Sequence, residues 1–397
     1  SWIFSNGWIE LPDGHEEDHE KANKTRNALC TFALREIFQA LGWSGIHRLA
    51  KRCGDPRLVG WELIKEPFER EEMAEWLCQW YLEASQGSSL YDSLTSGVLH
   101  ALPQAELLDF LDTCLSQLEQ KSASSEKMAG FMVNAPQGMS LWQLIENQYQ
   151  MLLDHFWLNV RPSYFQSNKE QLLFCIEKLL AAGRPRTAIN AMGDRSSDLP
   201  GESLILILKG IAAGQEEDAE FPRSWHISRI FKALTDAGYN PAEMVSLEFI
   251  YYPLLKRDEY GAPYLMAEIL GNPDFFIELI CLAYKPHNTA REPLPEHLQT
   301  AARTASSLLH EERGVPGMNH NGEINSELFF SWINRVRELA KENDREVVTD
   351  LTMGAWFSDW PLNKNVECWP HPIIADLLDQ DECKDIRRGF KTGVHNT

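Results

Sequence analysis

Apolar residues recur at intervals of three and four along most of this chain. That spacing places them on one face of an α-helix, so it predicts a succession of amphipathic helices, each with one buried side. The clearest stretches are 107–118, 141–152, 172–180, 227–234 and 329–339. The run Ser203–Leu208 is almost entirely apolar and suits either a strand or a buried helix. Because helical patterns flank it on both sides, we favour the buried helix.

Short turns of one kind separate several of these stretches. Glycine just past a helix end adopts the left-handed conformation at little cost, Asp or Asn can cap the next helix, and Pro fits its first position. Four segments follow this scheme in whole or in part: Gly54–Pro56, Gly183–Pro185, Gly238–Pro241 and Gly271–Pro273. Helices joined by so few residues pack as antiparallel neighbours. The chain is therefore predicted to be all-α, an irregular stack of antiparallel helical hairpins similar to an α-solenoid.

The sequence gives weaker indications of domain boundaries than of helices. No strict repeat period emerges, because the turns are unevenly spaced. The small, polar segment 121–127 is the most linker-like stretch, and Pro286–Pro295 is a second candidate boundary. We therefore expect three parts: an N-terminal helical unit, 1–127; a central hairpin array, 128–290; and a C-terminal helical unit with a Trp- and Pro-rich loop, 291–397.

Charge and cysteine content narrow the classes of partner. The formal net charge is −21, and nucleic-acid binding requires Lys and Arg to neutralise phosphates. A nucleic-acid-binding helical array is therefore an alternative that we disfavour; its basic residues would be Arg184, Arg186 and Arg195, or Arg387 and Arg388. The eight cysteines form no CxxC pair, which argues against structural zinc and suits buried thiols in a reducing cytoplasm. No apolar run is long enough to span a membrane, so we expect a cytoplasmic protein.

The clearest catalytic string is His15–His19, which fits the pattern H-E-x-x-H. On a helix, His15 and His19 would face one zinc ion and Glu16 would act as the base, so a zinc-dependent hydrolase is an alternative function. However, a turn precedes the string and its filler residues are acidic, which favours a solvated helix start. Carboxylate runs such as 216–218 are likewise interpreted as solvated surface. Phosphate-binding loops and nucleophile elbows are absent, so we name no catalytic residue and no cofactor.

Aromatic residues near the C-terminus form a candidate binding surface. The chain has 13 Trp residues, and exposed aromatic side chains are good interface anchors. The candidates are Trp356, Phe357, Trp360 and Trp369, to which we add Arg184 and Arg186. The alternative for the aromatic group, which we favour, is that these side chains seal the end of the helical stack.

Two passages, Ile176–Ile189 and Ser228–Leu255, resemble hairpins of tetratricopeptide- or HEAT-like proteins. Together with Trp369–Pro372 they are similar to the α-helical C-terminal regions of large bacterial multidomain proteins, some of which belong to anti-phage defence systems. The resemblance implies a non-catalytic protein-recognition or scaffold role, such as that of the sensor part of a defence system. It also implies protein partners or other subunits of a complex. Because the sequence begins without Met, we expect a piece of a larger polypeptide.

Overall fold

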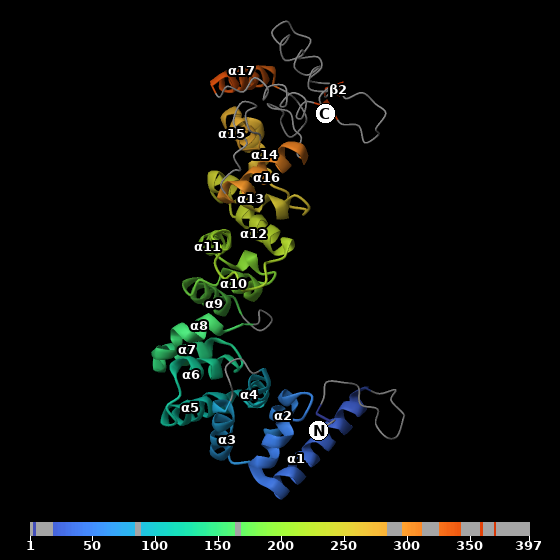
Figure 1. Ribbon diagram of the computed structural model, residues 1–397, viewed down its shortest axis with the longest axis vertical. Coiled ribbons are helices and arrows are strands. Elements are labelled where there is room, and N and C mark those ends of the chain that lie inside the picture. The colour runs from blue at the N-terminus through green and yellow to red at the C-terminus, as the bar shows by residue number, and fades with distance from the viewer. Residues whose placement is uncertain are drawn as a thin grey trace. The chain divides into compact units, whose positions relative to one another are not determined.

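The computed structural model describes residues 3–4, 19–83, 89–162, 168–283, 296–311, 325–342, 358–359 and 369–370 (Figure 1). The predicted all-α fold is confirmed, since helices make up nearly all the regular structure of these residues. The helices are α1 (His19–Ala50), α2 (Pro56–Leu63), α3 (Arg70–Leu82), α4 (Ser89–Ala101), α5 (Gln104–Gln120), α6 (Ser125–Val133), α7 (Met139–Gln148), η1 (Gln150–Leu152), α8 (Leu153–Asn159), α9 (Lys169–Ala181), α10 (Pro185–Met192), η3 (Ser196–Asp198), α11 (Gly201–Ala212), α12 (Ser224–Asp236), α13 (Pro241–Leu255), α14 (Pro263–Gly271), α15 (Pro273–Ala283), α16 (Glu296–Glu311) and α17 (Ser326–Glu342). The strands β1 (Ser358–Asp359) and β2 (Trp369–Pro370) pair antiparallel.

The chain folds into two compact units. The first unit comprises Ser1–Leu199 and Gly214–Glu220, and the second comprises Pro200–Ala213 and Phe221–Thr397. The division into three parts, with boundaries after residues 127 and 290, stays a prediction. Residues 121–124 form a tight turn between α5 and α6, and the side chain of Ser124 accepts a hydrogen bond from Lys127 N and caps α6.

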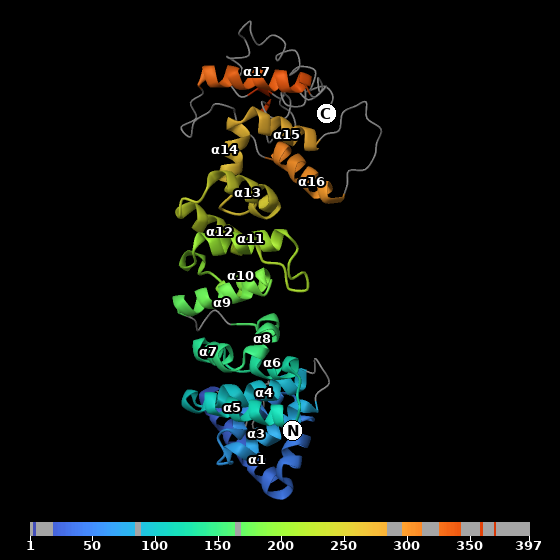
Figure 2. The ribbon, with the colours of Figure 1, turned by 90° about the vertical axis from the view of Figure 1, so that its left-hand side faces the viewer.

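In the first unit, helices pack against close neighbours in the chain. Figure 2 shows α5 to α10 following one another in this order, and α2 packs on α4, α3 on α5, α6 on α8, and α9 on α10. The tightest approach joins Gly60 of α2 to Gly97 of α4. A Cβ atom on Gly60 would lie 2.4 Å from Leu94 O, and one on Gly97 would lie 2.2 Å from Arg57 O. Only glycine allows the two backbones to cross so closely.

The second unit has one extended apolar core in its C-terminal part. Here α15 packs against both α16 and α17, with Phe276 and Trp332 in ring contact at 4.9 Å between centroids. Buried residues from Tyr252 to Leu339 form a single cluster. The ambiguous run Ser203–Leu208 lies inside α11, which confirms the helical interpretation.

The expected turns begin helices where the sequence places them. Asp55, Asn240 and Asn272 each accept hydrogen bonds from backbone N–H groups of the helix that follows. These helices, α2, α13 and α15, all start at a proline. Three of the four predicted turns therefore carry their own side-chain cap. No described helix is both long enough and apolar enough to cross a membrane.

A buried carboxylate performs the capping role for α14. Its N-cap residue, Ala262, has no side chain that can accept a hydrogen bond. Glu248 of α13 instead accepts from Leu265 N at 2.6 Å and from the hydroxyl of Tyr260 at 2.7 Å. Glu248 is fully buried, and burial raises the pKa of its carboxyl group above the ordinary value. The described residues provide no ion-pair partner for it.

Candidate functional site

The fourth turn, between α9 and α10, lacks a cap of its own. Gly183 has φ +71°, the left-handed conformation that ends α9, and Pro185 occupies the first position of α10. Between them stands Arg184, where the other turns have Asp or Asn, and its side chain makes no capping bond. The orphan N–H groups of the first turn of α10 therefore need a partner from elsewhere.

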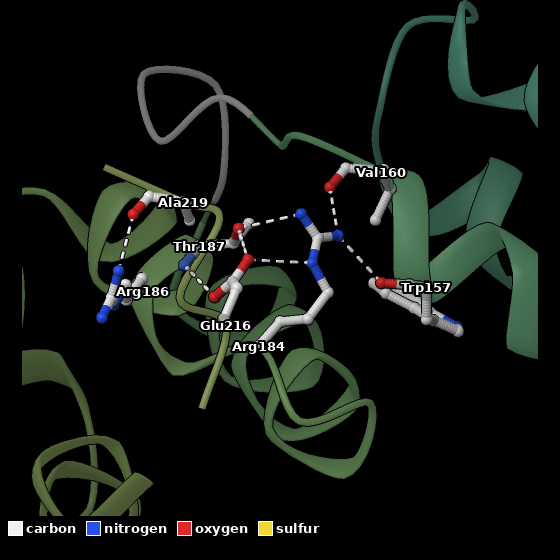
Figure 3. A network of polar contacts seen from close by, with 7 residues as sticks. All are labelled: Trp157, Val160, Arg184, Arg186, Thr187, Glu216 and Ala219. Atoms are coloured by element: carbon white, nitrogen blue, oxygen red, sulfur yellow. Dashed lines mark hydrogen bonds and ion pairs between the residues drawn. The ribbon is translucent and has the colours of Figure 1, made fainter. Parts of the chain in front are cut away.

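Glu216 supplies that partner from a loop 29 residues away in the sequence. Its Oε2 accepts from Thr187 N at 2.8 Å, and its Oε1 accepts from Arg184 Nε at 3.0 Å and from the Thr187 hydroxyl (Figure 3). Glu216 itself has φ +58°, which is strained for a residue with a Cβ atom, at a typical cost of ~1–3 kcal/mol. Hydrogen bonds to charged groups, worth ~1.5–3 kcal/mol each, offset this strain.

Arg184 continues the network toward α8. Its Nη1 donates to the carbonyl oxygens of Trp157 at 2.9 Å and Val160 at 2.7 Å, and its Nη2 donates to the Thr187 hydroxyl at 2.8 Å. Figure 3 shows the guanidinium between these carbonyls on one side and Glu216 on the other. One side chain thus satisfies carbonyls at the C-terminal end of α8, where a cation is favourable, and pairs with the anion that caps α10.

The side chain of Arg186 binds backbone carbonyl groups of the same loop. Its Nη1 donates to the carbonyl oxygen of Glu217 at 2.9 Å. It also donates to the carbonyl oxygen of Ala219 at 2.8 Å (Figure 3). These bonds join eight residues, which we call the Arg184 network: Trp157, Val160, Arg184, Arg186, Thr187, Glu216, Glu217 and Ala219. The network ties three segments of the first unit, namely the end of α8, the start of α10 and the loop 214–220.

A surface cavity of ≈ 680 Å³ lies beside the network. Its lining includes the buried Arg184 and Thr187 together with Glu216. It also includes exposed side chains from the end of α8, from α10 and from the loop: Leu158, Arg161, Asn190, Asp218 and Glu220. We call this hollow the Arg184 cavity. Its volume is within the range of ligand pockets, roughly 300–1,000 Å³.

Charge is unevenly distributed in the Arg184 cavity. Arg184 and Glu216 neutralise each other within the network. The remaining charged groups in the lining are Asp218, Glu220 and Arg161, and none of them forms an ion pair with another described residue. The lining therefore keeps an excess of one negative charge. No group of three or more metal-ligating side chains occurs in the part of the chain that the structure describes.

Two apolar side chains of η1 and α8 are exposed to solvent. Met151 in η1 is 60% exposed and Leu158 in α8 is 53% exposed. They are seven residues apart, which is about two helical turns, so they lie on the same side of this helical stretch. We call Met151 and Leu158 the α8 face. Leu158 also lines the Arg184 cavity, so apolar and charged surface meet at this residue.

The structure places two of the residues proposed from the sequence in this region. Arg184 is 8% exposed and four of its N–H donors are bonded inside the protein, whereas Arg186 is half-buried and binds the loop. Trp369 is described only in its backbone, which pairs with Asp359. The other candidates lie outside the described residues: His15, Glu16, Trp356, Phe357 and Trp360. His19 begins α1, and its side chain is outside the description as well.

Sequence reasoning missed Glu216. The run 216–218 was interpreted as solvated, which is correct for Glu217 and Asp218 but wrong for Glu216, whose carboxylate is bound by Arg184 and Thr187. One available signal was Arg184 itself, because a cation where a cap belongs leaves the first turn of α10 in need of an acceptor. That signal indicates the need for a carboxylate without saying which one.

Comparison with known proteins adds no assignment to these features. The candidate site is therefore interpreted from the contacts, burial and charge of its own residues. No protein-family model matches this chain, and no curated protein matches it.

Proposed function

We propose that this chain is a non-catalytic protein-recognition or scaffold region, and that a protein partner docks on the α8 face and over the Arg184 cavity. The proposal follows the expectation from the sequence that short helical hairpins present a binding surface. It adds a location, the end of α8 in the first unit.

The exposure of Met151 and Leu158 is the observation that carries the proposal. Protein interfaces combine apolar anchors with a polar, solvated rim. Methionine suits such a role because its flexible, polarizable side chain adapts to a partner's shape. The α8 face provides two exposed apolar anchors along the stretch formed by η1 and α8, and the charged lining of the cavity at Leu158 provides the polar edge.

The Arg184 network supports the proposal through rigidity. Binding costs less when the surface is already ordered, because fewer side chains and loops lose conformational freedom. Leu158 directly follows Trp157, whose carbonyl oxygen is held by Arg184. Asp218 lies between Glu217 and Ala219, whose carbonyl oxygens are held by Arg186. Both sides of the docking surface are therefore anchored to the same network.

The test compares two surface variants of the whole chain. The double variant Met151→Ser/Leu158→Ser removes the α8 face, and Leu206→Ser/Ile250→Ser removes two equally exposed apolar side chains of the second unit. Proteins captured from source cells by the unaltered chain are identified, purified and titrated against all three proteins by calorimetry. We expect at least a tenfold loss of affinity for the first variant and less than twofold for the control. Equal losses, or the absence of any purified partner that binds saturably, would contradict the proposal.

The resemblance noted in the sequence extends the proposal to one biological setting, the sensor part of a bacterial anti-phage defence protein. Its test is phage plating on cells that carry the unaltered gene or the Met151→Ser/Leu158→Ser variant at equal protein level. Protection that is lost in the variant supports this setting. Plating that does not differ between cells with and without the unaltered gene overturns it.

A further inference from the structure

We infer that the partner segment inserts a basic side chain, lysine or arginine, into the Arg184 cavity, with its aliphatic stem on Leu158 and its charged end against Asp218 and Glu220. This inference rests on the proposed recognition function and specifies the chemistry of the partner. It is drawn from the charge balance, the donor count and the rim of the cavity.

The charge balance favours a cation. Once the Arg184–Glu216 pair is set aside, the lining holds two exposed carboxylates against the single exposed guanidinium of Arg161. The whole chain carries a formal charge of −21, so its long-range field also attracts a basic partner.

The donor count disfavours an anion. A guanidinium has five N–H donors, and the network uses four of those of Arg184, on Trp157, Val160, Thr187 and Glu216. An anionic ligand would have to compete with Glu216 for this group, and separating a buried pair is costly. Arg161 would then be the main cation in the lining available to it.

The rim suits the shape of a long basic side chain. Lysine and arginine lay their methylene stems on apolar surface while the charged end stays near water. Leu158 provides the apolar contact, and the carboxylates of Asp218 and Glu220 belong to the same lining. The cavity is partly open to solvent at these exposed residues, so the inserted charge keeps part of its hydration.

The experiment uses the full chain and a defined probe. The probe is a fluorescein-labelled peptide, Leu-Arg-Leu-Arg-Leu, and its matched control carries neutral citrulline at both arginine positions. Binding is measured by fluorescence anisotropy at low and at physiological salt. We expect the arginine peptide to bind at least several-fold more tightly than the citrulline peptide, and equal binding of the two peptides would overturn the inference.

Three variants locate the charge effect. Asp218→Asn/Glu220→Gln should weaken binding of the arginine peptide about three- to tenfold, as expected for two exposed ion pairs. Glu177→Gln/Glu217→Gln removes the same charge outside the cavity lining and should change binding less than twofold. Arg161→Gln should strengthen binding about twofold, because it removes the opposing cation. Equal losses in both double variants would show non-specific attraction and overturn the inference.

The same variants separate this inference from the proposed function. A purified partner could lose affinity with Met151→Ser/Leu158→Ser but not with Asp218→Asn/Glu220→Gln. This result would overturn the inference of an inserted basic side chain and would still support the proposed recognition function. A partner that depends on neither pair of substitutions would overturn both. Loss of affinity with both double variants supports both.

Discussion

Two helices of this protein, α10 in the first unit and α14 in the second, begin without a side-chain cap of their own. In each case a distant glutamate accepts the N–H of the third helical residue, Thr187 or Leu265, and also accepts a hydroxyl group. The two sites differ in their counter-charge. Glu216 is paired with Arg184, whereas Glu248 is fully buried with uncharged donors alone among the described residues.

The difference shows two ways to keep a carboxylate inside a protein. A paired carboxylate stays charged at the cost of desolvating two ions, and removing one ion leaves the other uncompensated. A carboxylate with uncharged donors has its pKa raised by burial, and removing it leaves only neutral groups unsatisfied. The paired site should therefore be more sensitive to substitution than the unpaired one, although both perform the same capping role.

The largest expected effect is that of Glu216→Ala. It leaves the buried guanidinium of Arg184 without its anion and uncaps α10, so the free energy of unfolding should fall by about 3–5 kcal/mol. The measurement is urea unfolding followed by circular dichroism. Glu217→Ala, which removes an exposed carboxylate from the same loop, should change stability by less than about 0.5 kcal/mol. Similar losses of stability for both variants would contradict the role of Glu216 as the partner of Arg184 and the cap of α10.

A smaller effect is expected for Glu248→Ala. The donors left behind, Leu265 N and the Tyr260 hydroxyl, are uncharged, so the loss should be about 1–3 kcal/mol. The amide hydrogen-exchange rate in the first turn of α14 should also be higher in this variant. Glu259→Ala, an exposed neighbour of Tyr260, serves as the control. A loss larger than that of Glu216→Ala would break the comparison, because the counter-charge would then not decide the sensitivity.

A smaller loss of stability is expected when a local N-cap is removed. Asp55 caps α2 from the position directly before it and is partly exposed to solvent. Asp55→Ala should therefore cost about 1 kcal/mol, typical of an N-cap. The unfolding midpoint in urea measures it, and Asp55→Asn, which keeps an acceptor oxygen, should restore most of the loss. If Asp55→Ala were as damaging as Glu216→Ala, capping alone would explain the effect at α10.

The smallest effect is a pH dependence carried by Glu248. Because its pKa is higher in the folded protein than in the unfolded chain, the folded state binds the proton more tightly between the two values. The stability of the protein relative to Glu248→Ala should therefore rise as the pH falls through the folded pKa toward the unfolded one. Unfolding measured at a series of acidic pH values in both proteins tests this. A relative stability that instead falls with acid in this window would contradict the raised pKa.

Local patterns predicted much of the fold correctly. The spacing of apolar residues predicted the helices, and Asp55, Asn240 and Asn272 cap the helices that follow them. These features are readable because a cap acts on N–H groups only two or three residues away. The crossing of α2 and α4 at Gly60 and Gly97 could not be predicted this way, because a glycine inside a helical pattern does not indicate which backbone approaches it.

The candidate site likewise combines features that the local sequence predicts with features that depend on tertiary packing. The sequence by itself determined that a helix ends near Gly183 and that another begins at Pro185. Only the tertiary structure decided that Glu216 caps this second helix, that Arg184 is drawn inside by its pairing with Glu216, and that a cavity opens beside them. The physical reason is the distance along the chain: a bond that spans 29 residues leaves no spacing pattern, because it depends on how the intervening helices pack.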